Sequence, residues 1–319
     1  MTAPLLRIGS RGSPLALAQV EEVRRRLGAA HPELAAPGAI EVTIIKTTGD
    51  LVRDRTLAAV GGKGMFTKEI EEALLAGTID LAVHSMKDVT TFLPEGLAIA
   101  ACLPREDPRD AFFSRDGCPF RDLPAGAVVG TASLRRQAMV LHARPDLRVV
   151  PLRGNVETRL RKLQDGAVHA TLLALAGLKR LGLDGRATEI LSTELMLPAA
   201  AQGAIGIETR LRDDRTNRYV AALDDAPTAA RVTAERALLA ALDGSCRTPI
   251  AALAEIDAGG GTLRLRAAVV RPDGAERHDA VREGAPSDAA ALGTDAGEEL
   301  RRRAGPGFFD LPLPLGTPA

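Results

Sequence analysis

The alternation of hydrophobic and polar residues predicts strands and helices in turn from the start of the chain. Residues 5–8 form a short apolar run typical of a strand, and residues 17–27 carry Leu and Val at the spacing of one helical face. Ser13-Pro14 precedes this helix as an N-cap serine followed by proline at the first helical position. Residues 40–46 predict a strand, residues 61–77 a helix with Phe66 and Ile70 on its apolar face, and residues 79–84 a buried strand.

Residues 128–174 predict a second α/β unit of the same kind. Strands are expected at 128–131, 148–152 and 168–174, with helices at 134–143 and 156–164. The segments IGSRGSP (8–14) and VGTASLR (129–135) share the order strand end, glycine, hydroxyl residue and helix cap. This pattern predicts two similar α/β lobes with a cleft between them.

From about residue 226 the pattern changes. A helix is expected at 229–242, strands at 249–256, 262–270 and 276–282, and a final helix at 287–303. The turn Pro272-Asp273-Gly274 separates the last two strands. These elements predict a separate small α/β sandwich.

Composition narrows the class of protein. The 319 residues carry 41 Lys+Arg and 41 Asp+Glu, and this neutral balance argues against a general nucleic-acid or membrane-surface binder. Aromatic residues make up only 3%, so the cores are expected to be aliphatic. Three cysteines without a CxxC pair, and five histidines without metal-ligand spacing, indicate neither a disulfide framework nor a metal site. No signal peptide or membrane-length apolar run is recognised, so a cytoplasmic protein is expected.

The arginines concentrate where predicted strands meet predicted helices. Arg135 and Arg136 fall in the first turn of a helix, where a cation opposes the helix dipole, and Arg153 and Arg159 flank the next junction. Arg11 repeats this placement in the first lobe. Because ligands of open α/β sheets bind at the carboxyl ends of strands, a carboxylate-binding site would explain the placement. Solvated surface arginines from an Arg-rich genome are the alternative.

Three shorter motifs could carry chemistry. The run GGKG (61–64), with Lys63, could hold an anion but lacks the spacing of a P-loop; a mobile loop is the alternative. In HSMKD (84–88), Asp88 beside Lys87 could face a cationic reacting centre, or both could be ordinary surface residues. Cys246 lies in a predicted loop, DGSC, where it could be a nucleophile, although most lone loop cysteines are not. Cys102 is expected in the core, and Cys118 has no assigned role.

Taken together, these motifs resemble those of the porphobilinogen deaminase (hydroxymethylbilane synthase) family. The resemblance runs from Leu6 to beyond Arg303. It is carried, in order, by LRIGSRGSPLALAQ, VGGKGMFTKEIE, DLAVHSMKDV, REDPRDAF, GTASLRRQ, LRGNVETRL, LAGLKRLG, LPAAAQGAIGIE, RVTAERALL and DGSCRTPI.

The resemblance implies a three-domain α/β fold whose first two domains are similar to the lobes of type-II periplasmic binding proteins. Domain 1 would span 1–103 and 204–223, domain 2 would span 104–203, and domain 3 would span 224–319. The implied activity is the head-to-tail condensation of four porphobilinogen molecules to hydroxymethylbilane, with release of ammonia, in porphyrin biosynthesis. One dipyrromethane cofactor would prime the chain through a thioether to Cys246, which would make this residue an anchor and not a turnover nucleophile.

Other site residues follow from the same resemblance. Asp88 would be the catalytic carboxylate, which shuttles protons and stabilises the cationic azafulvene. Cofactor and substrate carboxylates would be bound by Arg11, Ser13, Ser85, Lys87, Thr131, Ser133, Arg135, Arg136, Arg153 and Arg159, with Gln19, Lys63 and Gln202 as further candidates. The resemblance implies a monomer that uses no metal and passes its product to uroporphyrinogen-III synthase.

The chain departs from the family pattern at three positions: Ala59, Thr90 and Ala132. None of them is Asp88 or Cys246, so activity is still expected. A non-catalytic anion-binding protein on the same two-lobed fold is the main alternative. A DNA-binding regulator is disfavoured by the zero net charge and by the lack of a helix-turn-helix segment.

Overall fold

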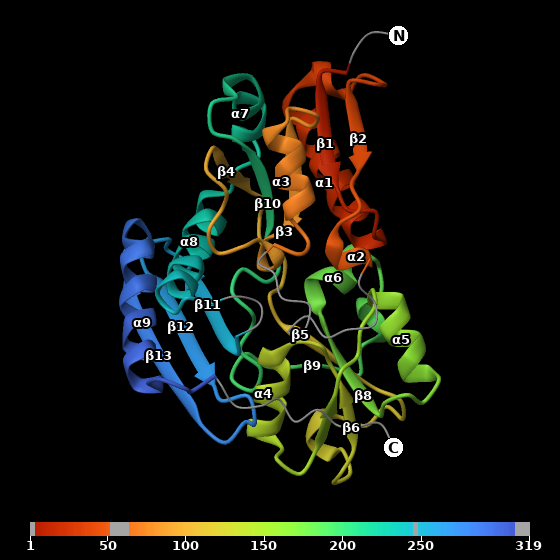
Figure 1. Ribbon diagram of the computed structural model, residues 1–319, viewed down its shortest axis with the longest axis vertical. Helices are drawn as coiled ribbons and strands as arrows, with labels where there is room; N and C mark the ends of the chain where they lie inside the picture. Colours follow the sequence, from red (N-terminus) through yellow and green to blue (C-terminus); the bar gives the residue numbers. More distant parts are fainter. Residues whose placement is uncertain (1–3, 52–63, 245–247, 310–319) are drawn as a thin grey trace. The chain divides into compact units, whose positions relative to one another are not determined.

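The computed structural model describes residues 4–51, 64–244 and 248–309 (Figure 1). These residues form three β-sheets and two compact units. The first unit comprises the chain up to residue 51, residues 64–106 and residues 203–229. The second unit comprises residues 107–202 and the described residues from 230 onward.

The first unit is built on a five-stranded sheet in the order β2-β1-β3-β10-β4. Strands β2, β1 and β3 are parallel, whereas β10 is antiparallel to both of its neighbours. The strands are β1 (Leu6–Ser10), β2 (Ile40–Ile44), β3 (Leu81–Ser85), β4 (Leu97–Cys102) and β10 (Ile205–Arg210).

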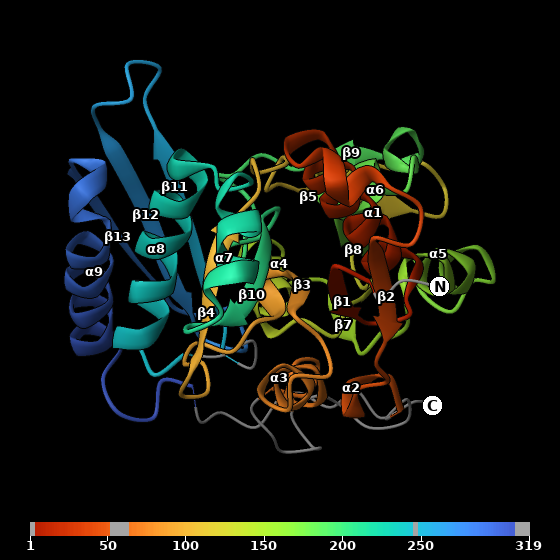
Figure 2. The same ribbon diagram turned by 90° about the horizontal axis from the view of Figure 1, so that it is seen from above.

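Helices cover both faces of this sheet (Figure 2). Side chains of α1 and α7 pack with alternate residues of β1, β3 and β10 on one face, and α3 packs on the other face. The helical segments are α1 (Pro14–Ala30), η1 (Pro32–Ala35), α2 (Thr48–Leu51), α3 (Lys68–Leu75), η2 (Met86–Asp88) and α7 (Asp214–Ala221). The core is aliphatic, as the composition predicts.

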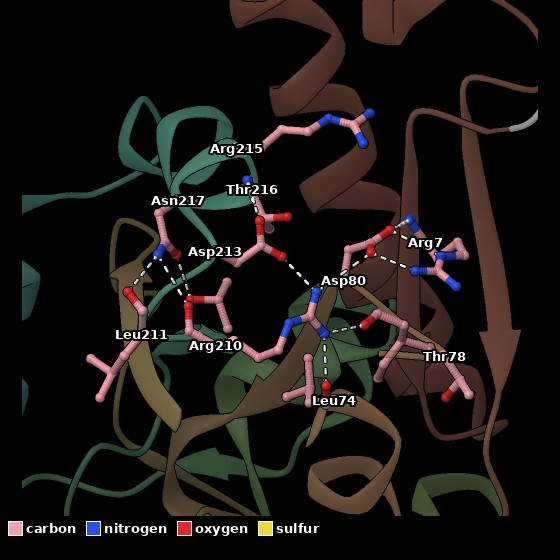
Figure 3. Close-up of polar contacts among 12 residues, drawn as sticks. Arg7, Leu74, Thr78, Asp80, Arg210, Leu211, Asp213, Arg215, Thr216 and Asn217 are labelled. Atoms are coloured by element: carbon pink, nitrogen blue, oxygen red, sulfur yellow. Dashed lines mark hydrogen bonds and ion pairs between the residues drawn. The ribbon is translucent and has the colours of Figure 1, made fainter. Parts of the chain in front are cut away.

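The amino end of β3 is closed by a polar cluster (Figure 3). Arg210, the last residue of β10, donates to the carbonyl oxygens of Leu74 and Ile79 at 2.7 Å each and to the Asp213 carboxylate at 2.5 Å. Asp80 in turn accepts from the Arg7 guanidinium at 2.7 Å. This cluster ties the end of α3 to the sheet.

The second unit contains a sheet of the same topology, in the order β7-β6-β8-β5-β9. Strands β7, β6 and β8 are parallel, and β5 is antiparallel to β8 and β9. The antiparallel strands are β10 in the first sheet and β5 in the second. Each begins within eight residues of a point where the chain passes from one unit to the other. The two lobes expected from the repeated sequence pattern therefore have matching strand orders.

In this sheet, α4 packs on one face, and α5 and α6 pack on the other. The strands are β5 (Asp110–Ser114), β6 (Val128–Gly130), β7 (Arg148–Val150), β8 (Ala170–Ala174) and β9 (Glu189–Ile190). The helical segments are η3 (Phe120–Asp122), α4 (Leu134–Ala143), α5 (Val156–Gln164), α6 (Leu175–Arg180) and η4 (Asp184–Arg186).

A third sheet is antiparallel, in the order β11-β12-β13, and α8 and α9 cover one of its faces (Figure 1). Gly293 and Gly297 allow α9 to approach α8 closely, because a Cβ on Gly293 would lie 2.1 Å from the Ala234 carbonyl oxygen. The elements are α8 (Ala226–Ala241), β11 (Ile250–Ile256), β12 (Leu263–Val270), β13 (Arg277–Gly284), η5 (Pro286–Asp288) and α9 (Ala289–Ala304).

The second and third sheets share one hydrophobic core, in which Leu253 and Val270 pack with α4 residues such as Met139. This shared core explains why both sheets fall in one compact unit. The fold is mixed α/β, as expected, while the boundaries of a three-domain division stay a prediction. Among the described residues, no helix is long and apolar enough to cross a membrane.

Candidate active site

The carboxyl end of β3 carries a short 3-10 turn that presents Asp88. Met86 N–H donates to the Ala204 carbonyl oxygen at 3.0 Å, and Val89 N–H donates to the Met86 carbonyl oxygen at 3.3 Å. Met86 is buried, Lys87 is half-buried and Asp88 is exposed. The turn is therefore anchored at its buried first residue, while the carboxylate of its last residue is exposed.

The neighbouring strand β1 brings further predicted residues to this edge of the sheet. Gln19 in α1 donates through Nε2 to Ser85 Oγ at 2.8 Å, so these two predicted residues are in direct contact. Ser13 caps α1 by accepting from the Ala16 N–H at 3.2 Å, as its position before Pro14 predicts. The Arg11 guanidinium lies over the Phe66 ring, 4.4 Å from the ring centroid. Because β1 and β3 are adjacent and parallel, Arg11 and Asp88 follow strands that end at the same edge.

In the second unit, the hydroxyl residues after β6 form the predicted helix start. Ser133 caps α4 by accepting from the Arg136 N–H at 3.4 Å, and Ser133 N–H donates to Thr131 Oγ1 at 3.2 Å. Thr131 is buried and Ser133 is half-buried. These side chains hold the first turn of α4, whose first residues include Arg135 and Arg136.

Arg135 and Arg136 are both buried, and both point their guanidinium groups at Asp110. Each donates to a different oxygen of the Asp110 carboxylate at 2.7 Å. The remaining Nη1 atoms donate to the carbonyl oxygens of Leu197 and Leu172, at 2.8 and 2.9 Å. The anion that offsets these two first-turn arginines is therefore a carboxylate of the protein itself. Their contact with ligand carboxylates stays a prediction.

Asp110 is ionised in this setting. Burial alone would raise the pKa of Asp110, but the charges and hydrogen bonds of Arg135 and Arg136 hold it far below its ordinary value. Gln202 also donates through Nε2 to Asp110, at 2.9 Å, and to the Pro108 carbonyl oxygen at 2.7 Å. Gln202, a predicted ligand-binding residue, thus supports the same carboxylate.

The junction after β7 carries the other two predicted arginines. Gly154 has a φ of +124°, and a Cβ there would lie 2.6 Å from the Thr158 side chain, so this tight turn requires glycine. Arg159 Nε donates back to the Gly154 carbonyl oxygen at 2.8 Å. Burial lowers the pKa of Arg153, which is half-buried. β6 and β7 are parallel neighbours, so Arg153 and Thr131 follow strands that end at one edge.

Two predicted residues, Cys246 and Lys63, lie outside the described residues, as does Ala59. Within the described residues, no group of three or more His, Cys, Asp or Glu side chains is arranged to hold a metal ion.

Sequence reasoning did not single out two buried groups next to the site. One is Asp110, although it stands inside the REDPRDAF motif. The other is a pair on neighbouring strands, in which His84 Nε2 lies 2.8 Å from Glu208 Oε2. A charged residue in an otherwise apolar strand was the only available signal for either group, and the sequence does not identify the partner.

Comparisons with known proteins identify the family of this chain. The family profile described as porphobilinogen deaminase, dipyromethane cofactor binding domain, matches residues 6–218, and that of the porphobilinogen deaminase C-terminal domain matches residues 229–302. Porphobilinogen deaminase of Nitrobacter winogradskyi is 60% identical over 307 residues, which cover 96% of each chain. The chloroplastic enzyme of Oryza sativa is 56% identical over 96% of this chain and 86% of its own length.

Among solved structures, a periplasmic binding protein of an ABC transporter from Brucella ovis, with glutathione bound, covers 75% of this chain and 68% of its own. That match has 16% identity and a TM-score of 0.42, so it carries no argument about function. The family profiles and the relatives matched over nearly their whole length show that this chain is a member of the porphobilinogen deaminase family.

Proposed function

We propose that this chain condenses four porphobilinogen molecules head to tail into hydroxymethylbilane, releasing ammonia at each addition, on a dipyrromethane primer attached to Cys246 by a thioether. The observation that carries the proposal is the exposed Asp88 carboxylate, held on a turn whose buried residue Met86 donates a hydrogen bond to Ala204, just before β10. Family membership supplies the substrate and the cofactor class.

In this proposal Asp88 handles both the proton and the charge of each addition. The protonated amino group of porphobilinogen leaves as ammonia, and the Asp88 carboxylate faces the positive charge left on the pyrrole. Once the new carbon–carbon bond has formed, Asp88 accepts the proton that leaves the attacking pyrrole carbon and passes it to solvent, which restores the carboxylate. Its exposure leaves room for a substrate ring, and the anchored turn fixes its direction.

The residues at the strand ends fit a cofactor and a substrate that carry carboxylates. Arg11, Lys87, Arg153 and Arg159 are the proposed cationic ligands, and Ser13, Thr131 and Ser133 add hydroxyl donors. When bound, the primer supplies a nucleophilic pyrrole carbon for the first addition. Arg135 and Arg136 would reach ligand carboxylates from their shared position on Asp110, and Ser85, Gln19, Gln202 and Lys63 would complete the set.

Mass spectrometry of the intact protein tests the primer. The purified chain should exceed its sequence mass by one dipyrromethane. This addition should be lost in Cys246→Ser and kept in Cys118→Ser, which changes a half-buried free thiol. An unmodified chain from a host that makes porphobilinogen would reject the proposal and favour the non-catalytic anion-binding alternative.

Ammonia release from porphobilinogen tests Asp88. Asp88→Asn should keep the fold and the primer but lose about 10²–10⁴-fold in turnover, the usual contribution of general acid–base catalysis. Glu95→Gln, at an exposed carboxylate of the same unit, should retain full turnover. Near-normal ammonia release by Asp88→Asn would refute the assigned role.

The remaining parts of the proposal concern the setting of the enzyme. A monomer is proposed, so light scattering should give a molar mass near the 33.5 kDa of one chain. Transfer of hydroxymethylbilane to uroporphyrinogen-III synthase and a cytoplasmic location are proposed as well. The sparse cysteines, without a CxxC pair, support a reducing compartment.

A further inference from the structure

A buried polar pair lies directly before the Asp88 turn. His84 and Glu208 have side chains that are 5% and 0% exposed, and His84 Nε2 lies 2.8 Å from Glu208 Oε2. His84 belongs to β3 and Glu208 to the antiparallel strand β10, 124 residues later. Burying such a pair costs free energy of desolvation, so a stable core alone would be better served by apolar residues.

The strand register places this pair on the face that α3 covers. Ala82 packs with α3, and side chains alternate along a strand, so His84 shares this face. On β10, Gly206 stands opposite His84, and Glu208 stands two residues farther on, opposite Ala82. His84 and Glu208 therefore form a diagonal pair across the two strands, with Gly206 beside His84.

Met86 connects the pair to the turn. A Cβ on Gly206 would lie 2.0 Å from Met86 Sδ, so the Met86 side chain occupies the space that a larger residue on β10 would fill. Met86 is 1% exposed, and its N–H bonds to the Ala204 carbonyl oxygen. The first residue of the Asp88 turn thus packs against the β10 position that lies opposite His84.

The other titratable group that faces the pair is Glu71 of α3. Burial raises the pKa of Glu71, and the charges of Glu208 and of the neighbouring Glu72 raise it further, while His84 opposes the shift. Glu71 Oε1 and Glu208 Oε1 are both buried without a hydrogen-bond partner among the described residues. The strand β4, on the other side of β10, brings Leu97–Cys102, whose only titratable side chain is Cys102. The described neighbours thus leave the His84–Glu208 contact as the bond that fixes both side chains.

We propose that His84 and Glu208 are positioning residues: their buried bond fixes β3 against β10 beneath Met86 and so sets the direction of the Asp88 carboxylate. The inference rests on the proposed function, because it assigns these residues a part in the reaction of Asp88. Both side chains are buried, so we assign them no contact with substrate. They would affect the direction of the Asp88 carboxylate through the position of Met86.

A double-mutant cycle with Asp88 tests the proposal, with ammonia release measured per primer-loaded molecule. Glu208→Leu should lower kcat about 100-fold with KM for porphobilinogen unchanged, as expected when a reacting group is displaced by about 1 Å. Asp88→Glu already moves the carboxylate by one methylene, so adding Glu208→Leu there should cost less than about 3-fold. Glu208→Gln, which keeps a hydrogen-bonding group of the same shape, should stay within about 5-fold of wild type.

Two further variants keep the test decisive if Glu208→Leu does not fold. Gly206→Ala displaces Met86 without touching either member of the pair and should lower kcat about 10-fold. Thr209→Val is the matched control: it removes a buried 2.6 Å hydrogen bond to Asn217 from the adjacent position of β10, on the opposite face, and should leave kcat unchanged.

Equal losses from Glu208→Leu with and without Asp88→Glu would overturn the inference, since a merely structural role lowers both backgrounds alike. Full turnover in a folded Gly206→Ala variant would overturn it too. Either result with an active wild type leaves the proposed function intact. A wild-type chain that releases no ammonia from porphobilinogen would instead reject the function itself.

Discussion

The two lobes begin in the same way but use their arginines differently. In each lobe a strand runs into a serine that caps the following helix, Ser13 in the first and Ser133 in the second. In the first lobe Arg11 is half-buried and stacks on the Phe66 ring. In the second lobe Arg135 and Arg136 are buried on one carboxylate.

This difference shows that burial and partner, more than sequence position, decide what a cation at a helix start can do. An arginine over an aromatic ring is held partly by a cation–π contact with the face of that ring. Arginines that share a buried aspartate are held in place by it, and the aspartate stays ionised because they lower its pKa. The first arrangement holds one half-buried cation against a ring, and the second holds two buried cations on an ionised carboxylate.

Asp110→Asn should break the second arrangement and give the largest loss. It leaves two buried guanidinium groups without their counter-charge, which should cost about 3–5 kcal/mol of unfolding free energy. Urea unfolding of the purified variant measures this loss. The control is Asp116→Asn, at an ion pair whose carboxylate is 70% exposed, and it should cost less than about 1 kcal/mol.

The same variant has a defined pH dependence. The folded-state pKa of Asp110 is depressed, so its stabilising contribution is present above the unfolded pKa of about 3.9 and is lost as the pH falls toward the folded value. The stability gap between wild type and Asp110→Asn should therefore narrow below about pH 4. A constant gap down to about pH 3 would show that the aspartate charge is not what holds the arginines.

Arg210 extends the comparison to an arginine whose hydrogen-bond acceptors all belong to the first unit (Figure 3). Arg210→Met removes the hydrogen bonds to the Leu74 and Ile79 carbonyl oxygens and to the Asp213 carboxylate, which should cost about 2–3 kcal/mol in urea unfolding. Arg24→Met removes an exposed i,i+3 pair of the same unit and should cost less than about 0.5 kcal/mol. Equal losses in the two variants would mean that burial does not distinguish these arginines.

Much of the fold could be predicted from local signals. The bounds of α4 and α5 match their predictions because Ser133 and Asn155 cap them. The helix predicted from residue 61 is wrong at its start: among the described residues α3 begins only at Lys68, so Phe66 precedes it. β4, β5 and β9 were not predicted, since short apolar runs carry no clear period and β9 has only two residues.

Sequence reasoning could predict a candidate site residue only where its own position, such as the end of a strand, marks it. Arg11, Asp88 and Arg153 follow strands, and the end of a strand can be read from its apolar pattern. The contact of Arg135 with Asp110 spans 25 residues, and that of His84 with Glu208 spans 124. No periodicity relates such partners, because sheet topology alone brings them together.

Glu71→Gln should reveal a carboxylate with the opposite pH behaviour to Asp110. Burial raises the pKa of Glu71, so its ionised form destabilises the folded state, and stability rises as the pH falls through that raised value toward the ordinary 4.5. Thermal unfolding at about pH 8 should show Glu71→Gln more stable than wild type by up to about 1 kcal/mol, with the gain fading near pH 4.5. Glu72→Gln, at a side chain that is 61% exposed, should show no such gain. A gain that is the same at both pH values would contradict a titrating Glu71.

Phe66→Leu should give the smallest effect and acts on the Arg11 side of the comparison. Loss of the ring removes a cation–π contact of about 0.5–1 kcal/mol, which loosens Arg11 without removing its charge. If Arg11 binds a substrate carboxylate, KM for porphobilinogen should rise about 2- to 5-fold with kcat unchanged, because uniform binding is weakened. Phe66→Tyr keeps the ring and should behave as wild type. A fall in kcat at constant KM would place Arg11 with the groups that act on the transition state, and the two lobes would then differ in more than how their arginines are held.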